Sequence, residues 1–345
     1  MAIPDRGFRD YVAAYTDAIR STRYAELDVL QPPPFGTLSE GGAGTAYALA
    51  RLGETRRARR WIAAVLADRR AVAYQAPGGS ARTHGSYLFG RAGVRWVQAI
   101  LEPEAGAPAF ARVVRVPGAM DELAHGTAGH LLALALLVEH RPDPRLARLG
   151  AKLAVHLERA VRARAEHAWA VTDTRGVAHG WAGILYALVV WHRVRCAPLP
   201  GWIADALVRL AAAATPGAGP AYYAGAWCNG EGGMVLLWVA AFAATGMPAF
   251  VDAARASARV AAAANQVESS LCCGRGGVAF ALLALHRIDP RGRWRTQARA
   301  IAARAIADAT LRWTNGLFQG HPGLVCLALD CIADAPRGFP AIETS

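Results

Sequence analysis

Two kinds of helical pattern alternate along the chain. One kind is apolar on almost every side, which predicts buried helices; it covers residues 127–137, 181–191, 232–242, 276–285 and 322–332. The other kind is richer in arginine and has apolar residues at three- and four-residue spacing, which predicts amphipathic helices; it covers residues 55–70, 145–164, 202–213, 249–264 and 294–311. The alternation predicts an inner set of helices surrounded by an outer set.

Each apolar run begins at two glycines that are separated by two residues, a unit we call the glycine tetrad. The tetrad occurs seven times, with its two glycines at positions 41 and 44, 90 and 93, 126 and 129, 180 and 183, 230 and 233, 274 and 277, and 320 and 323. The second glycines follow one another at steps of 49, 36, 54, 50, 44 and 46 residues. A period in this range indicates one helix-turn-helix unit per repeat.

Seven such units predict an all-α fold, an α/α toroid of seven inner and seven outer helices. An open superhelical solenoid is the alternative. Neither end of the chain has the polar character of a capping repeat, which favours closure. We expect a single domain over residues 1–345, in which residues 1–38 form a first amphipathic helix and a lead-in loop.

Composition excludes several classes of protein. With 54% hydrophobic and 19% charged residues, the chain has a globular composition. The net charge of +12 suggests nucleic acid as a partner, but the arginines are spread along the amphipathic segments and form no dense block. We therefore expect no nucleic-acid partner, although an acidic peptide segment would be attracted.

Location follows from the apolar runs and the amino terminus. The apolar runs are shorter than the roughly 20 residues that cross a bilayer. Residues 1–6 lack the basic start and apolar stretch of a secretory signal. We expect a cytoplasmic protein without a membrane span, in which six cysteines are better explained by burial or metal binding than by disulfides.

Cysteine supplies the first candidate chemistry. Cys228 lies two residues before the fifth tetrad, and Cys272 and Cys273 directly precede the sixth. Because repeats superpose, these thiols should meet at one end of the body, and three thiolates favour zinc with an open fourth position. The alternative is that they are small buried residues beside the glycines. The remaining cysteines fall in apolar helical patterns and are expected to be buried: Cys196, Cys326 and Cys331.

Several of the tetrads lie within longer motifs. These are Ala178-His179-Gly180-Trp181-Ala182-Gly183-Ile184, Trp227-Cys228-Asn229-Gly230, Cys272-Cys273-Gly274 and Gly316-Leu317-Phe318-Gln319-Gly320. Together with the tetrads they resemble the lanthionine synthetase C-like family, the peptide cyclases of lantibiotic biosynthesis and their stand-alone relatives, over nearly the whole chain. The family fold is an α/α toroid with zinc at one end of the barrel, in agreement with the repeat pattern.

The resemblance assigns the metal ligands. By motif, Cys228, Cys272 and Cys273 match the first, second and third zinc ligands of the family. Most members have histidine as the third ligand, so this chain carries the all-cysteine variant that some members share. A third thiolate makes the zinc centre more negative than imidazole does, and we expect a bound substrate sulfur to be more nucleophilic.

The resemblance also assigns acid–base residues. His179 matches the histidine proposed in the family as general acid or base, a role suited to a side chain that exchanges protons near neutrality; the alternative is a buried histidine that satisfies a backbone carbonyl. Glu122 is the counterpart of the family's acidic residue, with Asp121 beside it, and a carboxylate here would orient His179 or hold a water. The alternative is a loop acid or helix cap. His125 and His321 are not expected to be catalytic.

Two positions depart from the family pattern. In nisin-type cyclases an arginine lies four residues ahead of the first zinc cysteine, and here that position is Ala224. Tyr222, Tyr223 or Arg275 is a candidate to replace its hydrogen bonds. Asn229 stands where histidine or tyrosine is usual. These departures leave the substrate and the details of proton transfer open.

The resemblance implies a zinc-dependent cyclase of ribosomal peptide natural product biosynthesis, which adds peptide cysteine thiols to dehydroalanine or dehydrobutyrine to form lanthionine rings. We expect its partner to be a precursor peptide already dehydrated by a separate dehydratase, or by a kinase and lyase. Two alternatives stay open. One is a stand-alone enzyme that adds glutathione to dehydroamino acids; the motif Asp121-Glu122-Leu123 favours this alternative. The other is a non-catalytic toroid that binds a peptide.

Overall fold

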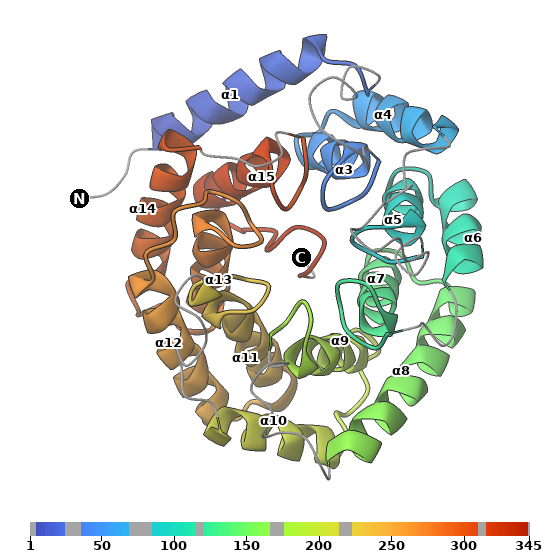
Figure 1. The fold of residues 1–345 in the computed structure, drawn as a ribbon, viewed down its shortest axis with the longest axis vertical. Coiled ribbons are helices and arrows are strands. Elements are labelled where there is room, and N and C mark those ends of the chain that lie inside the picture. The colour runs from blue at the N-terminus through green and yellow to red at the C-terminus, as the bar shows by residue number, and fades with distance from the viewer. Residues whose placement is uncertain are drawn as a thin grey trace.

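The structure is a computed structural model that describes residues 5–24, 36–68, 85–114, 120–165, 176–213, 223–309 and 315–343. The described residues form fourteen α-helices and no strand, which confirms the all-helical prediction. Among them no helix combines the length and the apolar character that a bilayer span requires. Figure 1 shows the helices arranged as two concentric rings.

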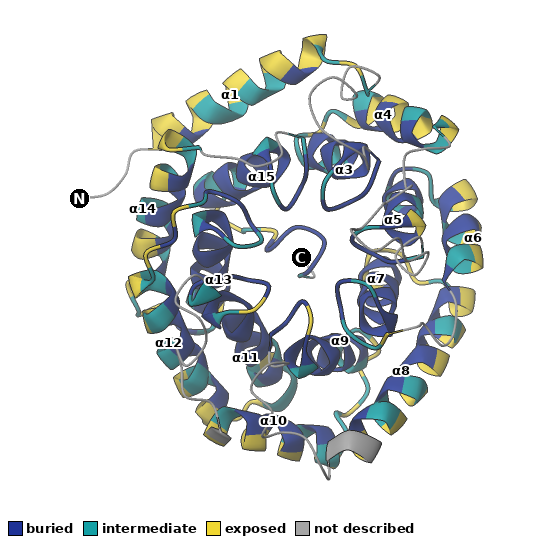
Figure 2. Ribbon diagram, viewed as in Figure 1, coloured by how far each residue is buried: buried dark blue, intermediate teal, exposed yellow. Residues whose placement is uncertain are grey.

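The inner ring consists of seven helices that are buried on nearly all sides (Figure 2). In α7, every residue from Thr127 to Val138 is buried. Each inner helix starts at one glycine tetrad, as the apolar runs predict. The inner helices are α3 (Gly42–Arg51), α5 (Arg91–Leu101), α7 (Thr127–His140), α9 (Trp181–Val194), α11 (Glu231–Thr245), α13 (Arg275–Ile288) and α15 (His321–Ile332).

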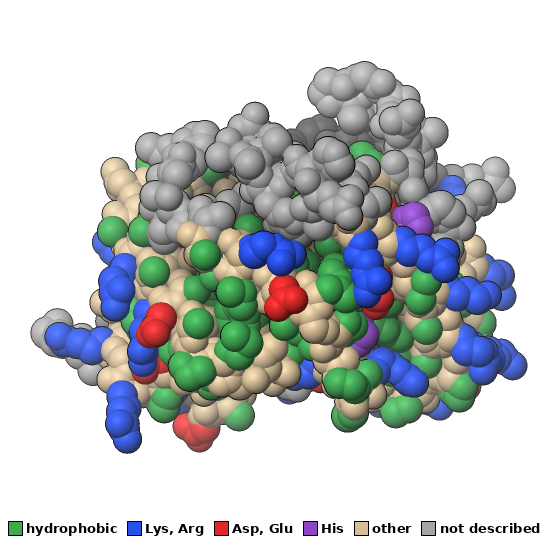
Figure 3. Space-filling view, turned by 90° about the horizontal axis from the view of Figure 1, so that it is seen from below, with side chains coloured by type: hydrophobic (Ala, Val, Ile, Leu, Met, Phe, Trp, Pro, Cys, Tyr) green, Lys and Arg blue, Asp and Glu red, His purple; other side chains and the backbone are tan. Residues whose placement is uncertain are grey.

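The outer ring consists of seven amphipathic helices with their exposed residues on the outside (Figure 2). Basic side chains are spread over the face seen in Figure 3 and form no single block. Three helices, α4, α12 and α14, end earlier than the predicted positions 70, 264 and 311. The outer helices are α1 (Asp5–Ser21), α4 (Thr55–Ala67), α6 (Pro103–Val113), α8 (Pro144–Ala165), α10 (Gly201–Ala213), α12 (Pro248–Ala263) and α14 (Trp294–Ala307).

The inner ring closes between its first and last helices. Each inner helix contacts the next, and α15 contacts α3. At this joint the guanidinium of Arg51 donates to Oδ1 of Asp330 over 2.6 Å, and both side chains are buried. The helix expected within residues 1–38, α1, packs on α15 and is the seventh outer helix. The closed toroid is thus confirmed against the open solenoid.

Close backbone approach explains the glycine tetrads. The first glycine of each tetrad is the N-cap of an inner helix and has an extended backbone. At the second glycine, an added Cβ would lie 1.9–2.4 Å from the carbonyl oxygen six residues earlier in all seven repeats. At Gly183, this oxygen belongs to Val177. Because no side chain fits there, each loop can fold back over its helix start only at glycine.

Main-chain hydrogen bonds join the loops that precede the inner helices. In six successive pairs, the residue two positions before the first glycine donates its N–H to the carbonyl of the equivalent residue in the next loop, with N···O distances of 2.8–3.3 Å. The pairs are Ser39 to Leu88, Ala124 to Ala178, Ala178 to Cys228, Cys228 to Cys272, Cys272 to Phe318, and Phe318 to Ser39. These bonds hold neighbouring loops in one register around the mouth of the barrel.

Residues 338–343 lie in the middle of the inner ring (Figure 1). The hydroxyl groups of Tyr87 and Tyr186 donate to the carbonyls of Ala341 and Ile342, each over 3.0 Å. Phe339 is fully buried and contacts aromatic rings from three repeats at centroid distances of 5.2–5.8 Å: Phe280, Trp227 and Phe318. The centre of the barrel is therefore packed beneath the mouth.

Candidate metal centre and histidine cluster

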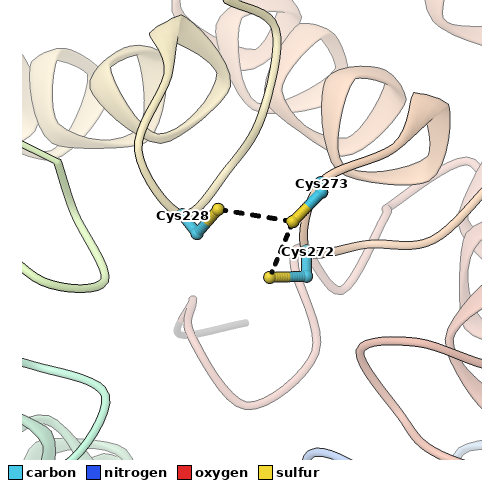
Figure 4. A group of neighbouring side chains, drawn as sticks. All are labelled: Cys228, Cys272 and Cys273. Atoms are coloured by element: carbon cyan, nitrogen blue, oxygen red, sulfur yellow. Dashed lines mark hydrogen bonds between the residues drawn. The ribbon is translucent and has the colours of Figure 1, made fainter. Parts of the chain in front are cut away.

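Three thiols meet at the mouth of the barrel. Cys228 lies in the loop before α11, and Cys272 and Cys273 lie in the loop before α13 (Figure 4). The Sγ atom of Cys273 is 3.5 Å from that of Cys228 and 3.5 Å from that of Cys272. All three sulfur atoms lie within 4.8 Å of one another. Cys228 is buried and the other two are partly exposed, so solvent reaches one side of the cluster.

The sulfur geometry and chemistry fit zinc. Sulfurs bound tetrahedrally to zinc at 2.3 Å lie about 3.8 Å apart, close to the observed spacing. Hydrogen bonding with Cys272 lowers the pKa of Cys228, but hydrogen bonding with Cys273 and burial outweigh it and raise that pKa to about 12. Hydrogen bonding with Cys228 and Cys273, together with burial, raises the pKa of Cys272 well above its usual range. Adjacent thiolates repel one another, so a cation favours their ionised form.

A histidine cluster lies in the loops before α7 and α9. Oε1 of Glu122 is 3.1 Å from Nδ1 of His125, and Oε2 is 3.0 Å from Nδ1 of His179. The two imidazoles stack with centroids 5.4 Å apart and planes 23° apart, and Phe89 stacks on His125 at 4.9 Å. These three polar groups also lie within 4.8 Å of one another, but their hydrogen bonds already account for the arrangement.

The charge of Glu122 fixes the histidine tautomers. Burial alone would raise the pKa of Glu122, but hydrogen bonds with His125 and His179 outweigh it and lower that pKa to about 2. The ionised carboxylate only accepts hydrogen bonds, so both Nδ1 atoms carry a proton. Neutral His179 then has its bare nitrogen at Nε2. The His179 side chain is 46% exposed, so this nitrogen belongs to a ring that solvent reaches.

The two predicted carboxylates have different partners. Glu122 is hydrogen-bonded to His179 and also accepts the backbone N–H groups of Ala124 and His125. Oδ1 of Asp121 lies 2.9 Å from Nε2 of His156 on α8, which ties this loop to the outer ring. The two alternatives for the acidic motif thus combine in Glu122, which is both a loop cap and a partner of the histidine.

Three cysteines lie away from the thiol cluster. Cys326 and Cys331 are fully buried in α15, as expected. Cys196 was expected in an apolar helical run, and this is wrong. It is exposed, follows the C-cap of α9, and has a φ of 49°, because the helix ends before the apolar pattern does.

Of the candidates to replace the hydrogen bonds of the family arginine at Ala224, Tyr223 lies beside the thiol cluster. Burial and the charges of the three clustered thiols raise the pKa of Tyr223, so its phenol lies within electrostatic reach of them. Arg275 donates to the carbonyl of Gln266 in its own preceding loop and to the carboxylate of Asp308 after α14, each over 2.8 Å. Tyr222 lies outside the described residues.

Both clusters contribute residues to one register, which we call the mouth ring: His125 and His179 from the histidine cluster and Cys273 from the thiol cluster. It comprises the residues that directly precede the first glycine of each tetrad: Glu40, Phe89, His125, His179, Asn229, Cys273 and Gln319. Not one of these seven is buried. Two positions earlier, the seven equivalent residues are all at most 1% exposed: Leu38, Tyr87, Leu123, Val177, Trp227, Leu271 and Leu317. Each loop thus presents one residue to the core and the next but one to the mouth.

The mouth ring includes residues to which sequence context gives no role. His125 is not expected to act, yet it stacks on His179 and shares Glu122 with it. Asn229 is noted in the sequence only as a departure from the family. The sequence could have identified both residues by their register, because each stands at the same place in its repeat as His179 does.

Comparisons with known proteins agree with this fold. The family model described as "Lanthionine synthetase C-like protein" matches residues 35–344. No curated protein is significantly similar. The solved structure of nisin cyclase is similar with a TM-score of 0.60 at 16% sequence identity, over 98% of this chain and 96% of that chain; likeness at this identity shows the shared fold. Since the family model matches most of its length, the chain belongs to the lanthionine synthetase C-like family.

Proposed function

We propose that this protein is a zinc-dependent cyclase that joins peptide cysteine thiols to dehydroalanine or dehydrobutyrine and so forms lanthionine and methyllanthionine. One observation carries the proposal: a three-thiol cluster and a histidine held by a carboxylate share the mouth of one barrel. The first suits a soft metal, and the second suits proton transfer near neutrality. Family membership and the nisin cyclase fold support this reaction class.

Cys228, Cys272 and Cys273 are the residues that would hold the metal. A zinc ion held there would lower the pKa of a substrate thiol, so that the thiol would ionise at neutral pH. The partial exposure of Cys272 and Cys273 leaves room for the substrate to approach. The N-termini of α11 and α13 directly follow these loops, and their dipoles favour the negative charge of the thiolates.

His179 would move the proton. Its Nδ1–H is held by Glu122, which leaves Nε2 to accept the proton of the substrate thiol. The protonated ring then returns that proton to the α-carbon once the carbon–sulfur bond has formed. The ionised Glu122 stabilises the positive charge of the imidazolium between the two transfers.

A dehydrated peptide tests this function. The protein, purified without chelators, is incubated with a synthetic peptide that contains one cysteine and one dehydroalanine, and free thiols are counted by alkylation and mass spectrometry. We expect about one bound zinc per chain and loss of the alkylatable thiol without change of peptide mass. Cys273→Ala should leave the thiol free. If the wild-type protein and Cys273→Ala consume thiol at equal rates, the proposal is wrong.

Glutathione added to the same assay separates the alternatives. A peptide that gains the mass of glutathione faster than it cyclises would identify the stand-alone thiol-transferase instead. A peptide that binds but keeps both its thiol and its double bond would identify a non-catalytic toroid. We expect cyclisation to prevail, because binding holds the peptide thiol and the acceptor at the same mouth.

A further inference from the structure

Asn229 occupies a place in the mouth ring that the proposed chemistry has not used. Following the ring in chain order, His179, Asn229 and Cys273 come from consecutive loops. The backbones of these loops are joined one residue earlier, where Ala178 N–H donates to Cys228 O over 2.8 Å and Cys228 N–H donates to Cys272 O over 3.3 Å. In the order of the ring, Asn229 therefore comes between His179 and Cys273.

Consecutive mouth-ring side chains lie near one another where both are aromatic. The centroids of Phe89 and His125 are 4.9 Å apart, and those of His125 and His179 are 5.4 Å apart. The same backbone register continues into the loop of Asn229. We expect a similar spacing there, so that a group bound between the thiols and His179 is within reach of the Asn229 carboxamide.

The carboxamide is exposed but its position is restricted. Asn229 is exposed to solvent, and its Oδ1 lies over Gly176, where an added Cβ would be only 2.3 Å away. Gly176 opens the loop that carries His179, so Asn229 packs against the histidine's own loop. An Asn NH₂ group is a neutral donor at any pH.

The reaction proposed above creates a charge that needs such a donor. When the thiolate sulfur bonds to the β-carbon, the Cα=Cβ double bond breaks. Its electron pair moves through the α-carbon onto the carbonyl oxygen, which becomes an enolate oxygen. His179 then gives a proton to the α-carbon, and the carbonyl is restored. A donor that meets the oxygen as its charge develops lowers the barrier by electrostatic stabilisation.

We propose that Asn229 binds the carbonyl oxygen of the dehydroamino acid and stabilises its enolate during thiol addition. The assignment rests on the proposed cyclase function. It also gives a reason for asparagine at this position. Another anionic or ionisable side chain beside three thiolates would add repulsion or a competing proton, whereas a carboxamide donates without charge.

The test measures kcat, KM and zinc content of Asn229→Ala and Asn229→Asp with the peptide described above. We expect kcat to fall about 100-fold in Asn229→Ala, because the hydrogen bond strengthens only as charge develops. KM and zinc content should stay close to those of the wild type. Asn229→Asp keeps the shape but loses the donor and adds a negative charge, so we expect it to be the slower of the two.

Gln319→Leu is the matched control. Gln319 carries the same carboxamide in the same mouth ring, but its loop lies on the far side of Cys273 from His179. We expect its kcat to stay within about threefold of the wild type, since removing it leaves every donor on the His179 side in place. Circular dichroism confirms that all three variants are folded.

Three results would overturn the assignment. The first is a kcat in Asn229→Ala above half of the wild-type value. The second is an equal loss in Gln319→Leu, which would indicate a general effect of mouth polarity. The third is a loss of kcat that follows a loss of zinc. An inactive wild-type protein would overturn the cyclase function itself, whereas these three results require an active wild type and leave that function standing.

Discussion

The thiol cluster and the histidine cluster are built on the same loop register, but their polar groups find partners in different ways. In the histidine cluster, one carboxylate accepts from two imidazoles and two backbone N–H groups, and its pKa falls to about 2. In the thiol cluster, the sulfurs meet one another, and the pKa values of Cys228 and Cys272 rise. One loop design therefore yields a cluster whose carboxylate charge is stabilised by its own hydrogen bonds and another that favours an added cation.

Removing one thiol should have the largest effect, because it destroys the cation site that distinguishes the thiol cluster from the histidine cluster. In Cys272→Ser, we expect zinc to fall from about one equivalent to below about 0.2 per chain, and thioether formation to fall to background. The hydroxyl is a poor ligand for a site selected by soft thiolates. Metal analysis by inductively coupled plasma mass spectrometry gives the first value and the alkylation assay the second.

Cys326→Ala controls for the loss of a cysteine as such. Cys326 is a buried, free cysteine in α15, away from the mouth loops, and its removal should leave zinc content unchanged. Full zinc content in Cys272→Ser would contradict the assignment of the thiol cluster as a metal centre.

Loss of the acid–base residue should act on the reaction without touching the metal. In His179→Ala, we expect kcat for cyclisation to fall about 100- to 10,000-fold while zinc content stays at the wild-type level. His125→Ala should have a smaller effect, because His125 touches His179 and Glu122 but is not the proposed proton donor. Steady-state kinetics compare them. A larger loss in His125→Ala than in His179→Ala would exchange the two roles.

The loop register itself can be tested at Gly183. A methyl group there would meet the carbonyl oxygen of Val177 at 1.9 Å, and we expect Gly183→Ala to reduce the free energy of unfolding by about 3 kcal/mol. Gly7 in α1 is the control, since an added Cβ there has nothing within 4 Å. Gly7→Ala should raise that free energy by about 0.5–1 kcal/mol. Urea unfolding measures both free energies. An unchanged free energy of unfolding in Gly183→Ala would refute the close-approach explanation.

Ionisation of Glu122 should make the free energy of unfolding depend on pH. The pKa of Glu122 is lowered from 4.5 to about 2, so its ionised form stabilises the fold above about pH 4.5, and this contribution is lost as the pH falls through 2. In Glu122→Gln, we expect a loss of about 1–3 kcal/mol at pH 7. Urea unfolding from pH 6 to pH 3 should show that the difference in free energy of unfolding between variant and wild type becomes smaller. A difference that grows on acidification would contradict the assigned charge.

Features with a short sequence period could be predicted. The tetrads give the inner helix starts, and the shared register brings Cys228 and Cys272 to adjacent loops, because both depend on contacts within or between neighbouring repeats. Contacts between distant segments could not be predicted. The pairing of Asp121 with His156 depends on how an outer helix meets a loop, and the place of Cys196 depends on where α9 ends. Neither leaves a periodic signal.

The packing of Phe339 beneath Trp227 has a consequence for the order of folding. The thiol loops belong to consecutive repeats, so only a short segment of chain has to close into a loop to bring them together. Phe339 and the α1–α15 contact instead join segments far apart in sequence, and such contacts cost more chain entropy and form more slowly. We expect the sulfurs to assemble before the barrel is complete. A cation captured at that stage would act as a template around which the remaining repeats fold.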